Sequence, residues 1–123
     1  MEETRGFKGL DVYQKAYKLS LEIHRLSFKF PKEEQFGLAS QIRRASTSIP
    51  LNIAEGYGRR ESKGDYLRFI QIAKGSAFEM LVLLDYAKDV GYIEPRAEHN
   101  SLYSDYEEVI RMLVGLRKHI EKS

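Results

Sequence analysis

The sequence predicts an all-α protein, an antiparallel up-down-up-down four-helix bundle formed by one domain over residues 1–123. Four segments repeat apolar residues at alternating steps of four and three, which is the periodicity of packed helices. Prolines and glycines separate these segments, and none of them shows the strict alternation of a β-strand. The expected helices span residues 10–30, 33–56, 63–90 and 95–121, and their short connections require neighbouring helices to run antiparallel.

The first helix carries an apolar seam made of Val12, Ala16, Leu19, Ile23, Leu26 and Phe30. Pro31 ends it, because proline lacks a backbone donor and clashes with the preceding turn. The seam of the second helix is Leu38, Ile42, Ala45 and Ile49. Gly56 and Gly58 are expected to end this helix with a left-handed residue. Pro50 lies inside the seam and is expected to kink the helix, or to split it near Ser48 and Ile49.

The third helix has a seam made of Phe69, Ala73, Ser76, Met80, Leu83, Ala87 and Val90. Ser62 is its expected N-cap, with Asp65 placing a carboxylate near the positive end of the helix dipole. Gly91 ends it, and Pro95 suits the first turn of the fourth helix. The fourth seam is Leu102, Tyr106, Val109, Leu113, Leu116 and Ile120.

Two helices carry more apolar residues than one seam needs. The third adds Leu67, Ile70, Ala77, Phe78, Leu81, Val82 and Leu84, and the first adds Leu10, Tyr13, Tyr17, Leu21 and Phe28. A helix that is apolar nearly all round must be covered nearly all round. Either the third helix is deeply buried within its own bundle, or these faces form a subunit interface. The interface is favoured, because large exposed apolar patches are uncommon on monomers.

Composition excludes several classes of protein. The chain has no cysteine, so it has neither a disulfide framework nor a thiolate metal site, and a reducing cytoplasmic location is expected. The longest aliphatic run, residues 80–84, is too short to cross a membrane. The net charge is only +2, but basic residues are in excess over residues 41–75, where a polyanion could bind.

The candidate nucleic-acid contacts are the basic residues of this region: Arg43, Arg44, Arg59, Arg60, Lys63 and Arg68. Tyr57 and Tyr66 lie near the turn between the second and third helices, and basic residues interleaved with aromatic ones suit phosphate contact and base stacking. The alternative is a charged turn that is only solvated. Repetition around a symmetric oligomer would turn the cluster into a ring of charge and favour binding.

A polar cluster is expected where the second helix faces the third. Ser48, Asn52 and Glu55 share one face at helical spacing, and Ser76 and Glu79 offer partners on the third helix. Buried polar groups must be paired, because an unsatisfied one costs about 1–3 kcal/mol. The favoured interpretation is a network that fixes the register of the bundle, and the alternative is a pocket that holds a ligand.

No pattern of catalytic, cofactor-binding or metal-binding residues is present. His24, His99 and His119 lack the Glu-x-x-His spacing of bundle metal sites and are expected at or near the surface. The serines and threonine at residues 46–48 have no base in a recognised nucleophile arrangement, and no phosphate-binding loop occurs. The protein is therefore expected to be no enzyme and to have no cofactor.

Five stretches resemble a known family. They are FKGLDVYQKA at residues 7–16, FPKEEQFGL at 30–38, QIRRA at 41–45, SIPLNIAEG at 48–56 and GSAFE at 75–79. Together they resemble the four helix bundle protein family encoded by 23S rRNA intervening sequences. This resemblance implies a homopentameric ring and no established enzymatic activity. It also implies kinship with the accessory variability protein of diversity-generating retroelements, which works with a reverse transcriptase and nucleic acid.

Two functional hypotheses follow. The first is a homopentamer that contacts RNA or DNA through the basic region. The second is a scaffold that recruits a protein, such as a reverse transcriptase or an RNA-processing factor, without binding nucleic acid itself. An enzymatic function is the least favoured hypothesis, and a membrane partner is not expected.

Overall fold

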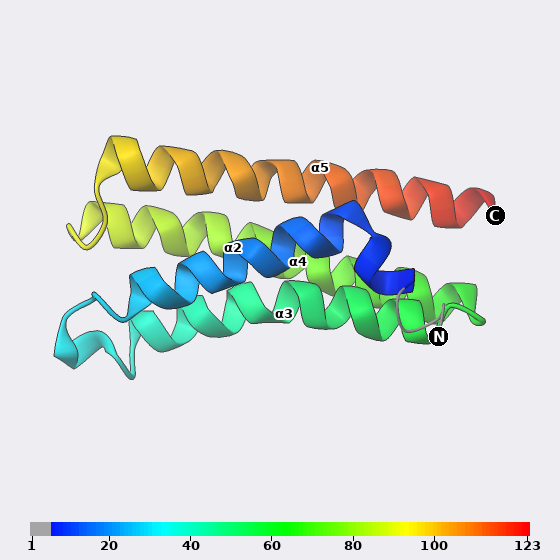
Figure 1. Ribbon diagram of the computed structural model, residues 1–123, viewed down its shortest axis with the longest axis horizontal. Helices are drawn as coiled ribbons and strands as arrows, with labels where there is room; N and C mark the ends of the chain where they lie inside the picture. Colours follow the sequence, from blue (N-terminus) through cyan, green and yellow to red (C-terminus); the bar gives the residue numbers. More distant parts are fainter. Residues whose placement is uncertain (1–5) are drawn as a thin grey trace.

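Four long helices run side by side along the molecule. The computed structural model describes residues 6–123, and within this range every regular element is helical. The long helices are α2 (Asp11–Ser27), α3 (Leu38–Gly58), α4 (Lys63–Asp89) and α5 (Asn100–Lys122), and consecutive helices point in opposite directions (Figure 1). Short helical turns precede them at η1 (Phe7–Gly9), η2 (Lys32–Glu34) and η3 (Pro95–His99). The predicted four-helix bundle is confirmed.

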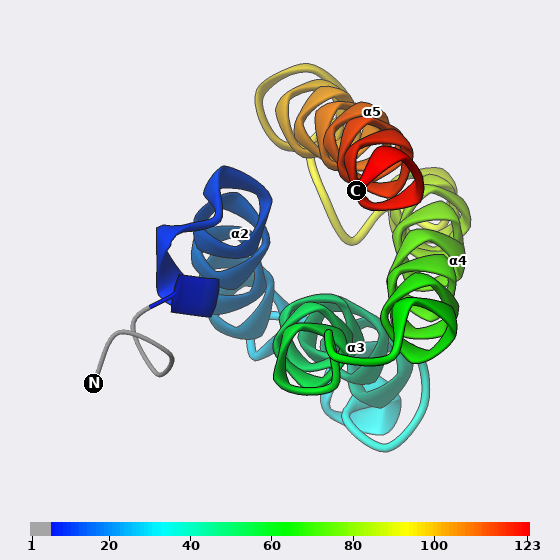
Figure 2. The same cartoon turned by 90° about the vertical axis from the view of Figure 1, so that its right-hand side faces the viewer.

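The helices follow one another around an arc, with α2 and α5 at its two ends (Figure 2). The views agree that α3 packs between α2 and α4, and that α5 packs beside α4. The N-terminal turn, the α3–α4 connection and the end of α5 share one end of the molecule (Figure 1). The α2–α3 and α4–α5 connections share the other end.

The predicted seams form the core with one shift. On α2, α3 and α5 nearly every seam residue is buried, and Ile23, Ile49 and Leu113 are fully enclosed. On α4 five of the seven predicted seam residues are buried, and further buried residues lie beside them: Tyr66, Ile70, Ala77 and Leu84. The predicted terminal seam residues Phe69 and Val90 are half-buried and exposed, respectively. A strict step of four and three drifts off one face of a straight helix over many turns, which explains the difference at both ends.

Three helix boundaries differ from the prediction by three residues or more, and one of them is the end of the first helix, at Ser27 rather than at residue 30. The second helix begins at Leu38 rather than at residue 33, because the Glu34 carboxylate accepts the Leu38 backbone N–H at 3.1 Å and caps the helix there. The fourth begins with the π-helical turn η3, where the Glu94 carboxylate accepts the Ala97 backbone N–H, and continues as α5. The expected Ser62 cap is present, with the Asp65 N–H donating to Ser62 Oγ at 3.2 Å.

Helix α3 is continuous through Pro50, so the expected split near Ser48 and Ile49 is wrong, and a kink stays a prediction. The left-handed role expected for Gly56 and Gly58 is also wrong. Among residues 6–123, only Gly91 has a positive φ, at 88°. Gly56 serves close packing instead, because a Cβ there would lie 3.0 Å from Phe69 Cβ and 3.3 Å from the Tyr66 carbonyl oxygen.

The surplus apolar residues divide between the core and the surface. Ile70, Ala77 and Leu84 are buried within the bundle, as the deep-burial alternative requires. Four residues one helical turn apart remain exposed on α4 and form what we call the α4 stripe: Phe78, Val82, Tyr86 and Val90, which are 51–60% exposed. A second set, on one face of α2 and its C-cap residue, forms the α2 stripe: Tyr17, Leu21 and Phe28. Two separate apolar surfaces therefore lack cover within the described chain.

None of the helices within residues 6–123 has both the length and the hydropathy that crossing a bilayer requires.

The close approach at Gly56 is tested by Gly56→Ala. The new methyl group would push α3 away from Phe69 and Tyr66, so we expect the free energy of unfolding to fall by about 1–3 kcal/mol. Urea denaturation measures this change.

Gly115→Ala on α5 is the matched control, because nothing lies within 4 Å of a Cβ there. Alanine should leave that helix as stable or raise its stability by about 0.5–1 kcal/mol. Equal effects of the two substitutions would contradict the role of Gly56.

Candidate functional site

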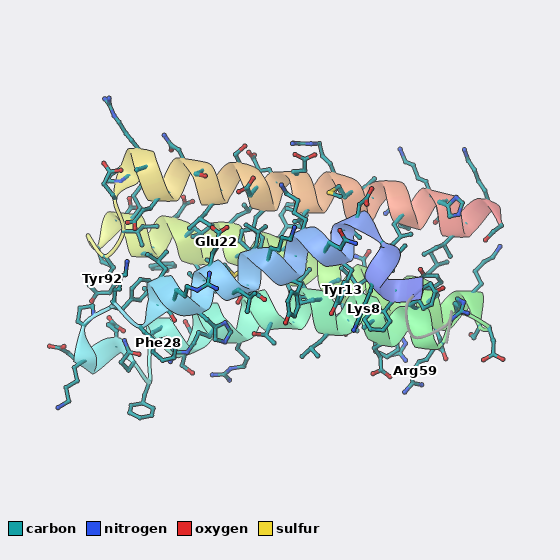
Figure 3. The ribbon with its side chains drawn as sticks, viewed as in Figure 1. Lys8, Tyr13, Glu22, Phe28, Arg59 and Tyr92 are labelled. Atoms are coloured by element: carbon teal, nitrogen blue, oxygen red, sulfur yellow. The ribbon has the colours of Figure 1, made fainter. Side chains whose placement is uncertain are left out.

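Basic side chains gather at the α3–α4 connection. Arg59 follows the last residue of α3, Lys63 is the first residue of α4, and Arg68 lies on its second turn. We call Arg59, Arg60, Lys63 and Arg68 the basic turn, and all of them are exposed. The labelled Arg59 marks this end of the molecule in Figure 3, whereas Phe28 and Tyr92 lie at the opposite end.

Aromatic rings hold the guanidinium groups of the basic turn. Arg60 lies 4.1 Å above the centroid of the Tyr57 ring, and Arg68 lies 4.5 Å from that of Phe69. Arg59 is 5.3 Å from the same Phe69 ring and donates to the Glu55 carboxylate at 2.8 Å. This hydrogen bond raises the pKa of Arg59, so the group stays charged. Stacked guanidinium groups are pre-positioned without losing their charge.

Lysine 63 joins α4 to the end of α5. Its ammonium group donates to the Ser123 carbonyl oxygen at 2.6 Å and to that of Glu121 at 3.3 Å. This contact brings the basic residues of the last α5 turns, Lys118 and Lys122, to the same end as the basic turn. Sequence reasoning missed them because they are distant in the chain, although the antiparallel order of the helices predicts the proximity.

A pocket of about 510 Å³ opens at this end. Tyr57 and Tyr66 contribute rings that meet edge to face, and Arg60, Lys63 and His119 contribute polar groups. Burial raises the pKa of Tyr66, so its hydroxyl stays neutral. Rings beside cationic side chains provide surfaces for stacking and for phosphate contact.

The other two predicted contacts lie elsewhere. Arg43 is half-buried near the start of α3, where it donates to Ser27 Oγ at 2.8 Å and to the Gln35 carbonyl oxygen at 3.0 Å. It also stacks on Phe28 at 4.6 Å. Arg44 is exposed and donates to Ser40 Oγ at 3.1 Å. The structure therefore does not bring Arg43 and Arg44 to the basic turn, and Arg43 joins α2, its following loop and α3.

The predicted polar cluster is present in part. Ser48 Oγ and Ser76 Oγ lie 2.9 Å apart and join α3 to α4. The Asn52 amide donates to Ser48 Oγ at 3.0 Å and to the Ser48 carbonyl oxygen at 2.8 Å. Glu55 and Glu79 are exposed and lie outside this hydrogen-bonded group. Glu55 instead pairs with Arg59 one turn along the chain, which keeps its carboxylate in solvent.

Histidine 99 is buried, contrary to the expectation from sequence. It is 7% exposed, its Nε2 lies 2.8 Å from Asp85 Oδ1, and its ring packs on Tyr103. The contact joins η3 to α4 and follows from the turn geometry of residues 90–99, which the sequence pattern did not reveal. No group of three metal-ligating side chains occurs within residues 6–123.

The chain is similar to known proteins in both sequence and structure. The family model of 23S rRNA-intervening sequence proteins matches residues 8–115. A similar solved structure is a protein of unknown function from the S23 ribosomal protein family of Bacteroides thetaiotaomicron. It is 26% identical, covers 96% of this chain and 99% of its own, and superimposes with a TM-score of 0.78. No curated protein matches the chain.

Arg43 and Arg44 have different roles, so substituting each of them should change the free energy of unfolding by a different amount. Arg43→Gln should lower the free energy of unfolding by about 1–3 kcal/mol, because Ser27 and Gln35 lose a charged donor. Arg44→Gln removes the same charge from an exposed position and should change it by less than about 0.5 kcal/mol. Urea denaturation of both variants measures the difference, and equal stabilities would refute the structural role of Arg43.

Proposed function

Because the chain belongs to the family of 23S rRNA-intervening sequence proteins, we propose that it is a non-enzymatic homopentamer that binds RNA or DNA through the basic turn. The observation that carries the nucleic-acid part is the set of guanidinium groups stacked on Tyr57 and Phe69 beside an aromatic pocket. Such groups provide phosphate contacts and stacking surfaces without sequence readout. Arg44 is a peripheral contact, and the absence of cysteine fits action in the cytoplasm.

Assembly is supported by the two uncovered apolar stripes. They lie on α2 and α4, which flank α3 on opposite sides (Figure 2). A ring with five subunits needs a heterologous contact, in which two different surfaces of each subunit meet. The α2 stripe of one subunit packed on the α4 stripe of the next supplies such a contact, and it removes both surfaces from water. Every subunit then presents its own basic turn.

A protein-recruiting scaffold is the second candidate function. Phe36, on the α2–α3 connection, is 98% exposed at the end opposite the basic turn. An exposed aromatic residue on a connection is a suitable anchor for a protein partner such as a reverse transcriptase or an RNA-processing factor. In this case the basic turn would only keep the protein soluble.

Nucleic-acid binding is tested with Arg60→Glu combined with Arg68→Glu and a labelled, structured RNA hairpin. Two lost phosphate contacts should reduce the slope of log affinity against log salt by about 2, with affinity weakened at least about tenfold in low salt. Titrations at several salt concentrations measure both quantities.

The control combines Arg96→Glu with Arg111→Glu, exposed arginines on η3 and α5, and changes the net charge equally. It should bind nearly as the parent protein does. Salt-independent binding, or equal losses in both variants, would refute the basic turn as the binding surface. Absence of RNA binding together with one stoichiometric protein partner would favour the scaffold.

Assembly is tested with Val82→Glu in the middle of the α4 stripe. We expect the parent protein to have five times the chain mass of 14.3 kDa, and the variant to dissociate because a carboxylate cannot be buried unpaired. Light scattering coupled to size-exclusion chromatography measures the mass. Ser104→Glu, at an exposed position on α5, should leave the mass unchanged. A monomeric parent protein would contradict the proposal.

A further inference from the structure

A second pocket lies between α3 and α4, beside the hydrogen-bonded serines. Its volume is about 300 Å³, and its walls are Gln41, Arg44, Ala45, Ser48, Ser76 and Glu79. These residues belong to the first half of α3 and the middle of α4, away from the basic turn. A volume near 300 Å³ is at the lower end of ligand pockets. It suits a small molecule rather than a polymer.

The pocket presents opposite charges from its two walls. Arg44 comes from α3 and Glu79 from α4, and the two side chains form no ion pair with each other. Arg44 uses one amino group on Ser40, and Glu79 has no hydrogen-bond or ion-pair partner among residues 6–123. A simple anion bound here would meet the Glu79 carboxylate, and a simple cation would meet the Arg44 guanidinium. A ligand that carries both charges would satisfy both walls.

The serine pair adds a hydrogen-bond donor between these charges. Ser48 Oγ and Ser76 Oγ share one hydrogen, and Ser48 also accepts from the Asn52 amide. Because each hydroxyl has one hydrogen and the pair uses only one, the other hydroxyl hydrogen remains available to a ligand. Ser48 is half-buried and Ser76 is only 8% exposed, so either hydroxyl lies deeper than the charged groups at the exposed rim.

We propose that this pocket binds a small zwitterion of the α-amino acid type. The guanidinium of Arg44 receives the ligand carboxylate, the carboxylate of Glu79 receives the ligand ammonium group, and the serine pair donates to a carboxylate oxygen. Bidentate contact between guanidinium and carboxylate favours this orientation. The site is separate from the basic turn and goes beyond the proposed nucleic-acid function.

The first experiment uses three probes of similar shape: L-glutamine, N-acetyl-L-glutamine without the ammonium charge, and L-glutaminamide without the carboxylate. Isothermal titration calorimetry on the full chain measures affinity, and amide chemical shifts of α3 and α4 locate the site. We expect L-glutamine to bind at least tenfold more tightly than either singly charged probe. Binding of all three with equal affinity, or of none, would overturn the proposal.

The second experiment assigns each charge to its wall. Glu79→Gln should weaken L-glutamine at least tenfold and should also weaken L-glutaminamide, which carries the ammonium group. It should not weaken N-acetyl-L-glutamine, which lacks that group. Arg44→Gln should weaken L-glutamine and N-acetyl-L-glutamine, which carry the carboxylate, and should not weaken L-glutaminamide, which lacks it. Glu108→Gln, an exposed glutamate on α5, is the matched control and should bind L-glutamine as the parent protein does.

Two further readouts separate this proposal from the assembly and nucleic-acid functions. Glu79→Gln should leave the RNA affinity unchanged, since Glu79 lies outside the basic turn, and the oligomer mass unchanged, since Glu79 is not part of the α4 stripe. If Glu79→Gln dissociates the oligomer and the parent protein binds no probe, a neighbouring subunit fills the pocket and the zwitterion proposal is wrong. Failure of RNA binding alone would leave the probe result intact.

Discussion

The close packing of α3 against α4 is the constraint on which the rest of the molecule depends. Gly56 lets the helices approach where a methyl group would collide with Phe69, and the Ser48–Ser76 hydrogen bond fixes their register. Ala45 on α3 and Ala73 on α4 are small buried residues. The connection between the two helices carries the basic turn, and the groove between them holds the polar pocket. Because the inner faces of α4 are buried in the bundle, its exposed apolar residues remain available to pack against another surface.

An ion pair and a hydrogen bond help to position the remaining helices and connections around this pair. Lys15 on α2 pairs with Asp105 on α5 at 3.3 Å, which joins the two ends of the arc. Tyr92 donates to Glu34 at 2.9 Å and links the two connections at the far end, and this hydrogen bond raises the pKa of the tyrosine. Partly exposed contacts of this kind contribute about 0–1.5 kcal/mol each, so they define geometry more than they stabilise it. The apolar core supplies most of the stability.

The sequence periodicity predicted the number, order and burial of the helices, because steps of three and four report directly on one helix face. It could not predict that Glu34 caps α3 at Leu38, since residues 33–37 would also fit a helical pattern. Composition identified a basic region, but not that Arg43 is held by Ser27 and Gln35. The partners of a side chain depend on which residues of different helices and connections lie next to each other, and the spacing of apolar residues does not reveal this. For the same reason the sequence placed His99 at or near the surface, whereas it is buried against Asp85.

The placement of the α3–α4 connection and the end of α5 at one end of the bundle gives the molecule polarity along its axis (Figure 1). The opposite end carries Glu33, Glu34, Glu94 and Glu98 together with Lys29, Lys32, Lys88 and Arg96, so its charges nearly balance, whereas the end with the basic turn has an excess of positive charge. In a ring of parallel subunits this difference would be repeated with the same orientation in each copy. The assembly would then have sidedness, with one rim attracting a polyanion more strongly than the other, so that a nucleic acid would approach that rim first.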